Sequence, residues 1–235
     1  MVETGGDLQL RVLESLEASR NYNGWIASMT RPYLGANPLE IGSGLGGNAG
    51  RWLATGVPRI TVSELNPQAL TSLRDRFADD DRVEVLELDV LDPPERSHSA
   101  VVAINVLEHV ERDVEALQGI RQLLAPGGCV VLFVPAFEAA MSRFDREIGH
   151  YRRYTVETLR RAFAAAAFDV ERCHYFNGPG LLAWFLGMRL LRMTPHDTVT
   201  LRAWDRLVVP IVRRMETWRP PPFGQSVFGV ARLPA

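Results

Sequence analysis

The sequence predicts an α/β protein in which an open, mostly parallel sheet carries helices on both faces. Segments with strand character and segments with helical spacing alternate five times between residues 38 and 134. Each predicted strand runs into a polar or glycine-rich turn, and the fifth strand is apolar throughout, as a central parallel strand is. These observations together indicate a doubly wound sheet.

The predicted elements follow in order. Helical spacing indicates two helices over 7–33, broken around Asn21–Gly24. Strands are expected over 38–41, 59–63, 83–88, 100–104 and 129–134, and helices over 48–54, 67–77 and 114–124, the last one stopped by Pro126-Gly127-Gly128. Beyond these we expect a loop over the sheet edge (137–154), a helix (156–167), a strand (170–176), an apolar segment (181–193), one amphipathic helix (203–218) and a final strand (226–233).

Composition limits the function classes. Of 235 residues, 46% are hydrophobic and 23% are charged, which suits one folded domain and excludes disordered classes. The 26 basic residues are all arginine and 28 residues are acidic, so no net basic field attracts nucleic acid. The absence of lysine excludes Schiff-base chemistry and a Walker-type phosphate loop.

Cysteine content and the N-terminal segment predict a cytoplasmic protein. Cys129 and Cys173 are too few for a disulfide scaffold, and Cys129 lies in an apolar run that we expect to be buried. The N-terminal segment is acidic and lacks the apolar core of a signal peptide. Uncharged runs such as 175–188 are shorter than the roughly 17–25 apolar residues of a membrane-spanning helix.

The turn after the first strand fits two nucleotide-binding patterns. Gly42, Gly44 and Gly47 match the G-x-G-x-x-G loop of dinucleotide-binding proteins, with Glu64 placed to bind a ribose. Glu40–Gly46 also match the acid-x-G-x-G-x-G loop of S-adenosylmethionine enzymes. The Glu40 carboxylate would repel a pyrophosphate and attract a cationic amine and sulfonium. Charge therefore favours S-adenosylmethionine.

Acidic residues at the ends of the next two strands agree with that choice. Glu64 is placed to accept both ribose hydroxyls, and Asp89 to accept from the adenine amino group while the Val90 N–H donates to the ring. Each acid alone is also compatible with a solvated turn or a helix cap. Their position at successive strand ends, behind a glycine loop, favours a nucleoside site, and Asn105 ends the fourth strand at the same edge.

Residues 35–135 resemble a class I S-adenosylmethionine-dependent methyltransferase. The resemblance is carried in order by Glu40–Gly46, Glu64, Asp89, Asn105–Val110 and Leu123–Gly128. It implies a Rossmann-like, seven-stranded, mostly parallel sheet with an antiparallel last strand and a helical cover, with S-adenosyl-L-methionine as cofactor. It also implies one methyltransferase domain over 1–235, made of a helical cover (1–34), a cofactor-binding core (35–135), an acceptor-side loop and helical insert (136–225) and the last strand (226–235).

The same resemblance assigns the cofactor-binding residues. Tyr22 and Trp25 resemble the N-terminal segment that lies over the cofactor, with plain core packing as the alternative. The complete set is Tyr22, Trp25, Glu40, Gly42, Ser43, Gly44, Gly46, Glu64, Leu65, Asp89, Val90, Asn105 and Val106.

His150 is the candidate catalytic base. It lies in the run G-H-Y-R-R-Y-T, which resembles a subgroup of bacterial methyltransferases from natural-product, sugar and envelope-lipid pathways. If the acceptor is a hydroxyl, a general base assists its attack on the methyl group. The alternative is that Asp145, Arg152 and Arg153 form a surface ion network that orders the loop, with His150 stacked between tyrosines.

The remaining histidines receive structural roles, and no metal site is expected. His98 is predicted to lie in a solvated loop, His174 among core residues of a strand and His196 in a loop. Glu108 and His109 are adjacent, and on a helix their side chains would point about 100° apart.

Residues 176–219 are both apolar and basic, with seven arginines against three acidic residues. We expect a helical cover or a dimer surface, so the protein is a monomer or a homodimer. A pocket for an apolar or anionic acceptor is one alternative, and peripheral docking on an anionic membrane is another.

The sequence as a whole predicts an S-adenosylmethionine-dependent methyltransferase that acts on a hydroxyl of a small molecule in a bacterial secondary-metabolite, sugar or lipid pathway. N- or C-methylation of a small molecule is the alternative. An NAD-dependent oxidoreductase is the competing class, but it must ignore Glu40 and find a substitute for the missing lysine. No nucleic-acid partner is expected, because the chain has no Asn-Pro-Pro-Tyr motif for base amino groups.

Overall fold

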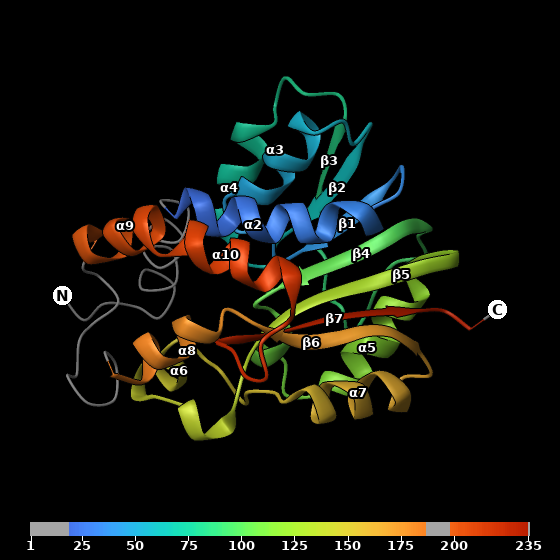
Figure 1. The fold of residues 1–235 in the computed structure, drawn as a ribbon. Coiled ribbons are helices and arrows are strands. Elements are labelled where there is room, and N and C mark those ends of the chain that lie inside the picture. The colour runs from blue at the N-terminus through green and yellow to red at the C-terminus, as the bar shows by residue number, and fades with distance from the viewer. Residues whose placement is uncertain (1–18, 187–197, 235) are drawn as a thin grey trace.

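A seven-stranded sheet forms the middle layer of the protein (Figure 1). The computed structural model describes residues 19–186 and 198–234. The strand order is β3-β2-β1-β4-β5-β7-β6, and only β7 runs antiparallel to its neighbours. The predicted fold class is confirmed: a doubly wound, Rossmann-like sheet with an antiparallel last strand.

The elements have these bounds. The strands are β1 (Pro38–Ile41), β2 (Ile60–Ser63), β3 (Val83–Leu86), β4 (His98–Ile104), β5 (Leu124–Pro135), β6 (Asp169–Phe176) and β7 (Ser226–Arg232). The helices are α2 (Arg20–Thr30), α3 (Gly47–Ala54), α4 (Pro67–Arg76), α5 (Asp113–Gln122), α6 (Arg143–Glu147), α7 (Val156–Ala165), α8 (Gly178–Trp184), α9 (Thr198–Leu207) and α10 (Val209–Trp218). Three short 3-10 turns are η1 (Arg31–Tyr33), η2 (Leu107–His109) and η3 (Glu138–Ala140).

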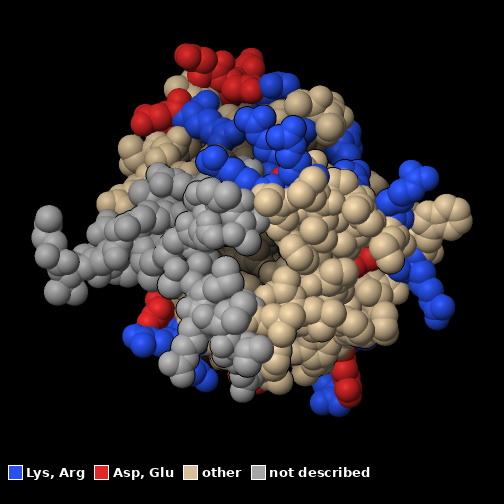
Figure 2. Space-filling model, turned by 60° about the vertical axis from the view of Figure 1, so that its left-hand side comes forward, with Lys and Arg blue, Asp and Glu red and all other residues tan. Residues whose placement is uncertain are grey.

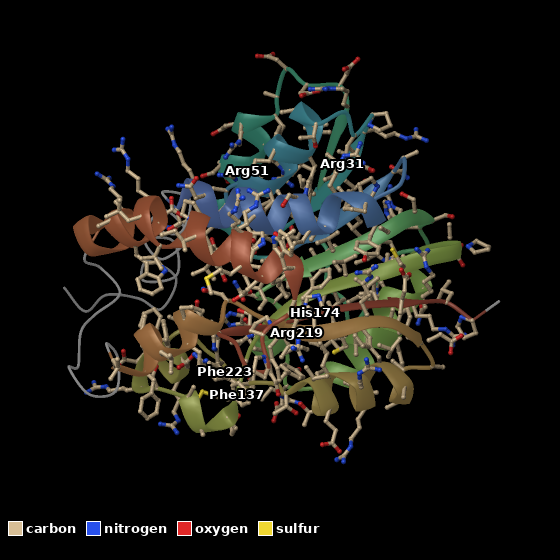
Figure 3. All side chains as sticks on the ribbon, in the orientation of Figure 1. Arg31, Arg51, Phe137, His174, Arg219 and Phe223 are labelled. Atoms are coloured by element: carbon tan, nitrogen blue, oxygen red, sulfur yellow. The ribbon has the colours of Figure 1, made fainter. Side chains whose placement is uncertain are left out.

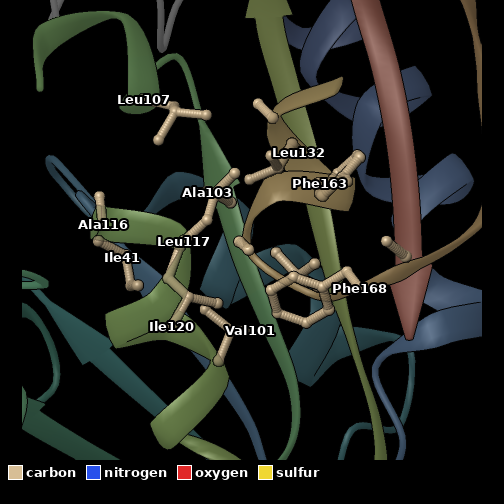
Figure 4. Packing of buried hydrophobic residues seen from close by; sticks show 14 of the residues in the cluster. Ile41, Val101, Ala103, Leu107, Ala116, Leu117, Ile120, Leu132, Phe163 and Phe168 are labelled. Carbon is tan, nitrogen blue, oxygen red and sulfur yellow. The ribbon is translucent and has the colours of Figure 1, made fainter. Parts of the chain in front are cut away.

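Each face of the sheet is covered by its own group of helices. On one face, Leu117 and Ile120 of α5 pack against Val101 of β4, and Phe163 of α7 belongs to the same cluster (Figure 4). On the other face, α2, α3, α4 and α10 contribute to a second cluster that includes the fully buried Trp52. Because helices cover both faces of the sheet, the carboxyl ends of the parallel strands are where a ligand can approach it.

The β5 strand begins earlier than predicted. Pro126-Gly127-Gly128 was expected to form a turn before the strand, but β5 starts at Leu124 and runs through it. His98 pairs with Leu124 and Ala100 with Cys129, so the intervening residues form an irregularity in the ladder, and Gly127 takes a positive φ of 74° there. The glycines accommodate a bulge within the strand.

The predicted break around Asn21–Gly24 is wrong, because α2 runs through it. The Asp205 carboxylate of α9 accepts hydrogen bonds from the backbone N–H groups of Asn21 (3.0 Å) and Tyr22 (2.9 Å). A distant residue therefore caps the start of α2, and no local signal announces it. The helix predicted before it lies outside the described residues.

The acceptor-side segment also differs from expectation. The loop predicted over 137–154 contains η3 and α6, the latter closed by a capping box between Ser142 and Asp145. The single helix predicted over 203–218 is two helices, α9 and α10, with Pro210 in the first turn of the second. Proline lacks the N–H that a continuous helix would need. The end of the apolar segment predicted over 181–193 lies outside the described residues.

Several side chains have well-defined positions. His98, expected in solvent, is only 2% exposed at the start of β4, because β4 begins two residues before its predicted start and carries it into the sheet. Desolvation lowers the pKa of His98. His174 packs on Phe228, and Phe137 stacks on Tyr175 with ring centroids 4.9 Å apart (Figure 3). Cys129 is buried as predicted.

No helix in the described part of the chain is long and apolar enough to cross a membrane.

Candidate active site

A cavity of about 950 Å³ lies at the carboxyl ends of the parallel strands. Its walls come from the turns after β1, β2, β3 and β4, and from α2, α6 and α8. The molecule is hollowed near the centre of the face shown in Figure 2, with basic side chains along the upper edge. Ligands of doubly wound sheets bind at this edge.

The glycine loop between β1 and α3 brings backbone close to the cavity. Gly42 has a φ of 63°, and a Cβ there would lie 2.5 Å from a methyl carbon of Val106. Gly44 has a φ of 54°. Residues with a side chain rarely adopt a positive φ, so both positions favour glycine. Ser43 fastens the loop, because its hydroxyl donates to the Glu40 carbonyl (3.1 Å) and accepts from the Ser63 N–H (3.3 Å).

Glu40 is a buried carboxyl group that the protein leaves incompletely bonded. It lines the cavity, is 2% exposed, and its Oε2 atom has no hydrogen-bond partner among the described residues. Burial raises its pKa to about 8. A cation entering the cavity would compensate this carboxylate, so the site fits the cationic amine of S-adenosylmethionine.

Glu64 is more fully bonded than the sequence suggested. One oxygen accepts the Gly44 N–H (3.0 Å), and the other accepts the N–H groups of Leu65 (2.9 Å) and Asn66 (3.1 Å). The carboxylate therefore ties the glycine loop to the end of β2, and a ribose would have to share acceptor positions with these bonds. Asp89 is exposed, and its Oδ1 accepts from the Leu91 N–H (2.9 Å).

Most of the predicted cofactor-binding residues line this cavity. They are Tyr22, Glu40, Gly42, Ser43, Gly44, Glu64, Leu65, Asp89, Val90, Asn105 and Val106. Tyr22 comes from α2, and burial raises its pKa to about 12. Asn105 has a φ of 53°, which turns the chain sharply after β4.

Trp25 and Gly46 are the two predicted cofactor-binding residues that do not line the cavity. Trp25 is 4% exposed and packs on Phe176, with ring centroids 4.1 Å apart, so it is a core residue. Gly46 caps α3 with a φ of 80°, and a Cβ there would lie 2.6 Å from the ring of Phe77. Its requirement for glycine comes from close packing.

The acceptor side of the cavity is organised by Asp145. The Arg153 guanidinium donates to its Oδ1 (2.6 Å), and the Ser142 hydroxyl donates to its Oδ2 (2.5 Å). His150 Nδ1 lies 3.0 Å from the same Oδ1. The Arg153–Asp145 pair is buried, with side-chain exposures of 3% and 1%. His150 lines the cavity with an 8% exposed side chain.

Asp145, Arg152 and Arg153 all form ion pairs, as expected, but they do not form one network on the surface. The Arg153 pair lies inside the protein, and Arg152 instead pairs with Asp113 at 2.9 Å. His150 does not stack between tyrosines. Its ring stands edge-on to His109, with centroids 4.6 Å apart and planes at 84°.

Sequence reasoning missed the cluster of Glu108, His109 and His150. The 3-10 turn η2 carries both Glu108 and His109 toward His150, and one ligand-type atom of each residue lies within 4.8 Å of the others. The expectation that the side chains of the adjacent Glu108 and His109 point in different directions, which holds for an α-helix, does not hold in this 3-10 turn. Burial raises the pKa of Glu108 to about 8. The pKa of His109 is lowered to about 4, mainly by burial and also by the charge of the neighbouring His150.

Two aromatic side chains in the wall were not singled out from the sequence. Phe144 of α6 and Trp184 of α8 line the cavity, and the Arg153 guanidinium lies 5.2 Å from the Trp184 ring centroid. Both elements follow the fifth strand in the chain, within the segment that we expect to form the acceptor side. The signal was the concentration of aromatic residues after Pro135.

Residues 39–130, from β1 into β5, match a family model described as a methyltransferase domain. The matched range holds the glycine loop, Glu40, Glu64, Asp89 and Asn105. Together with the glycine loop and Glu40, this match supports an S-adenosylmethionine-dependent methyltransferase.

Solved structures share the fold of this chain at low sequence identity. A complex of the Haloferax volcanii methyltransferase activator Trm112 with a methyltransferase matches with a TM-score of 0.66 and 17% identity, over 98% of this chain and 96% of that one. Geranyl diphosphate C-methyltransferase from Streptomyces coelicolor matches with a TM-score of 0.63 and 17% identity, over 88% and 77%. Phosphoethanolamine N-methyltransferase 2 from Haemonchus contortus matches with a TM-score of 0.64 and 18% identity, over 91% and 53%. No curated protein matches the sequence.

Proposed function

We propose that this methyltransferase transfers the methyl group to a hydroxyl of a small-molecule acceptor. The observation that carries the proposal is the Asp145–His150 pair, which lines the same cavity as the glycine loop. N- and C-methyltransferases share the fold, so the fold alone does not choose the atom. A general base is what a hydroxyl acceptor requires beyond alignment.

The cofactor is proposed to lie across the glycine loop, within one domain in which 35–135 bind it and 136–225 form the acceptor side. Glu40 would receive the amine, because it is the buried carboxylate with an unbonded oxygen that lies beside the glycine loop. Gly42 and Gly44 would let backbone approach the methionine part, and Asn105 would offer its carbonyl to the amine. Glu64 would bind the ribose and Asp89 the adenine amino group. S-adenosylmethionine supplies a methyl group activated by its sulfonium charge.

His150 is proposed to remove the hydroxyl proton. The Asp145 carboxylate lies 3.0 Å from Nδ1 without a formed hydrogen bond, and its negative charge would favour a proton on Nδ1 and leave Nε2 to accept one. As the acceptor oxygen forms its bond to the methyl carbon, the carbon–sulfur bond breaks with its electron pair on sulfur, and the hydroxyl proton passes to Nε2. Phe144 and Trp184 would hold an apolar part of the acceptor beside this nitrogen.

A screen of acceptors tests the reaction class. Small phenols, sugars, lipid alcohols, amines and activated carbon acids are incubated with methyl-labelled S-adenosylmethionine, and the product atom is identified by mass spectrometry and NMR. We expect O-methylated products. Products methylated only on nitrogen or carbon would overturn the proposal.

Single-turnover kinetics on the best hydroxyl acceptor test the base. His150→Gln should slow methyl transfer roughly 10²–10⁴-fold, while S-adenosylhomocysteine affinity stays within about twofold of the parent value. His174→Gln is the matched control, because His174 packs on Phe228 outside the cavity wall. A His150→Gln rate within threefold of the parent would return His150 to a purely structural role.

A further inference from the structure

Glu108, His109 and His150 present three ligand-type atoms to one point in the cavity wall. These atoms all lie within 4.8 Å of one another. The distance between Glu108 Oε1 and His150 Nε2 is 3.9 Å, too long for a hydrogen bond. Two ligand atoms that each lie about 2.0–2.2 Å from a tetrahedral ion stand roughly 3.3–3.6 Å apart, so an ion would draw these two atoms together by a few tenths of an ångström. The gap is suited to an ion that both atoms bind.

The Glu108 carboxylate has no other partner. Its side chain is 0% exposed, and within the described chain neither oxygen has a hydrogen-bond partner. The guanidinium of the buried Arg153 donates its hydrogen bonds to the Asp145 carboxylate and to the Ala136 carbonyl, and not to Glu108. Leaving a buried carboxyl unbonded is costly, so the position calls for a ligand from outside the chain.

His150 is already oriented for coordination. The Asp145 carboxylate lies 3.0 Å from the Nδ1 atom of its ring, close enough to hydrogen-bond after a small rotation, and Asp145 is itself held by Arg153 and Ser142. A carboxylate behind a histidine that binds metal through its other nitrogen is the usual arrangement around metal ligands. The support directs Nε2 toward Glu108.

We propose that Glu108, His109 and His150 form a binding site for a divalent transition-metal ion of the zinc class, open toward the cavity. Two imidazoles and one carboxylate favour zinc or cobalt over magnesium and calcium, which prefer all-oxygen ligands. Three protein ligands leave a coordination position free for an outside oxygen, as in catalytic zinc sites. All three residues line the cavity, so an acceptor can reach that position.

This inference rests on the proposed function for its chemical use and refines it. The ion would occupy Nε2 of His150, the nitrogen that otherwise takes the proton. A hydroxyl bound to a divalent cation loses its proton to water more readily than a free hydroxyl does. The preferred acceptors would then be those whose reacting hydroxyl has a second oxygen donor beside it, such as catechols and vicinal diols.

Metal binding to the full chain tests the site. Protein stripped with a chelator is titrated with Co²⁺, followed by its visible absorption, and with Zn²⁺ in competition with a chromogenic chelator. We expect one ion per chain. Glu108→Gln, which replaces a carboxylate by a neutral group of the same shape, should weaken binding at least 100-fold, and Asp145→Asn should weaken it roughly 10–100-fold.

Two controls keep the result interpretable. His174→Gln should bind the ion as the parent does, because His174 lies outside the cavity wall. Glu108→Gln must still bind S-adenosylhomocysteine, which shows that it is folded. Less than stoichiometric binding by the parent, or equal binding by Glu108→Gln, would overturn the site.

Neither readout needs an acceptor, so the site and the proposed function fail separately. O-methylation that is unchanged by the chelator, together with no bound ion, would overturn the site and leave the base role of His150 intact. Stoichiometric binding without O-methylation would support the site and overturn the proposed reaction.

Discussion

At the scale of single residues, the cavity is marked by carboxyl groups that folding leaves incompletely bonded. Glu40 at the end of β1 and Glu108 in η2 are both buried, and each has at least one oxygen without a partner among the described residues. Other carboxylates of the cavity wall accept several hydrogen bonds, for example Glu64 from backbone N–H groups and Asp145 from Arg153. The unbonded oxygens therefore indicate where ligands complete the structure.

Cofactor binding should depend on pH through Glu40. Its pKa of about 8 means that the empty enzyme holds a proton there at neutral pH, whereas the cofactor amine favours the charged form. Binding should therefore release a proton, and S-adenosylhomocysteine affinity should rise up to about tenfold per pH unit between pH 6 and 8. Calorimetry in buffers of different ionisation enthalpy measures the released proton.

The Glu40→Gln variant is the control for that experiment. It should bind more weakly at pH 8, by about 1.5–3 kcal/mol, because a charged hydrogen bond is lost. It should also show no proton release. The same pH slope in both proteins would assign the proton to another group.

Residue types and short motifs announced only part of this site. The acid before the glycine loop and the acids at the strand ends were visible because local spacing fixes their place on the sheet edge. Glu108 and His150 meet through the fold of α6 and its following loop, and no spacing rule relates them. For the same reason the core position of Trp25 could not be separated from a cofactor contact.

At the scale of elements, the acceptor-side loop depends on a buried ion pair. Arg153→Ala should destabilise the protein by about 3–5 kcal/mol, because it leaves the buried Asp145 carboxylate short of its main partner. Arg143→Ala is the comparison, since Arg143 pairs with Glu147 on the surface with 92% of its side chain exposed, and should cost less than about 1 kcal/mol. Urea unfolding of both variants gives the two values, and equal losses would contradict this account.

A second element-level prediction concerns the contact between α5 and the turn after β3. A Cβ at Gly119 would lie 1.8 Å from the Val90 carbonyl oxygen, and backbone cannot yield as a side chain can. Gly119→Ala should therefore cost about 3 kcal/mol or more and weaken cofactor binding, because Val90 lines the cavity.

Gly50→Ala tests whether the effect belongs to that contact. In α3 the nearest outside atom to its Cβ is an Arg76 nitrogen at 3.5 Å, which is ordinary contact. Alanine should be neutral there or stabilise the helix by up to about 1 kcal/mol. Similar losses for both glycines would show that the α5 contact is not special.

Helix and strand positions were largely predictable, and their ends were not. Apolar runs and turn residues placed β1, β2 and β4 because parallel strands at the centre of a sheet are buried on both faces. The start of α2 depends on Asp205 from the far end of the chain, and the start of β5 depends on pairing with His98. Both are tertiary effects that local sequence does not encode.

At the scale of the whole molecule, the sheet places all the chemistry at one edge. Alternation of strands and helices predicted this arrangement, since parallel strands bring their carboxyl ends together. The antiparallel direction of β7 came from the family resemblance, and pairing confirms it, whereas the place of β7 between β5 and β6 required the structure. The placement of α9 and α10 against α2 required the structure, because an amphipathic pattern does not say which surface it meets.

The stability of the ligand-free protein should fall as pH rises through the neutral range. The folded state holds the Glu40 proton up to about pH 8, whereas the unfolded chain releases it near the ordinary value of 4.5. Between these values the folded state binds more protons, so Glu40 alone should remove up to about 1.4 kcal/mol of unfolding free energy per pH unit. Glu108, whose pKa is also raised to about 8, adds a decline of the same sign in the parent and in the variant. His109, with its pKa lowered to about 4, acts in the opposite direction only below its ordinary pKa of 6.5, so the window to measure is pH 6.5 to 8.

Urea unfolding of the parent and of Glu40→Gln at each pH isolates the contribution of Glu40, because every other titratable group contributes equally to the stability of both proteins. The parent should lose stability relative to the variant up to pH 8 and then level off, and saturating S-adenosylhomocysteine should remove the difference in slope. Parallel curves for the two proteins would show that Glu40 is already ionised in the empty enzyme.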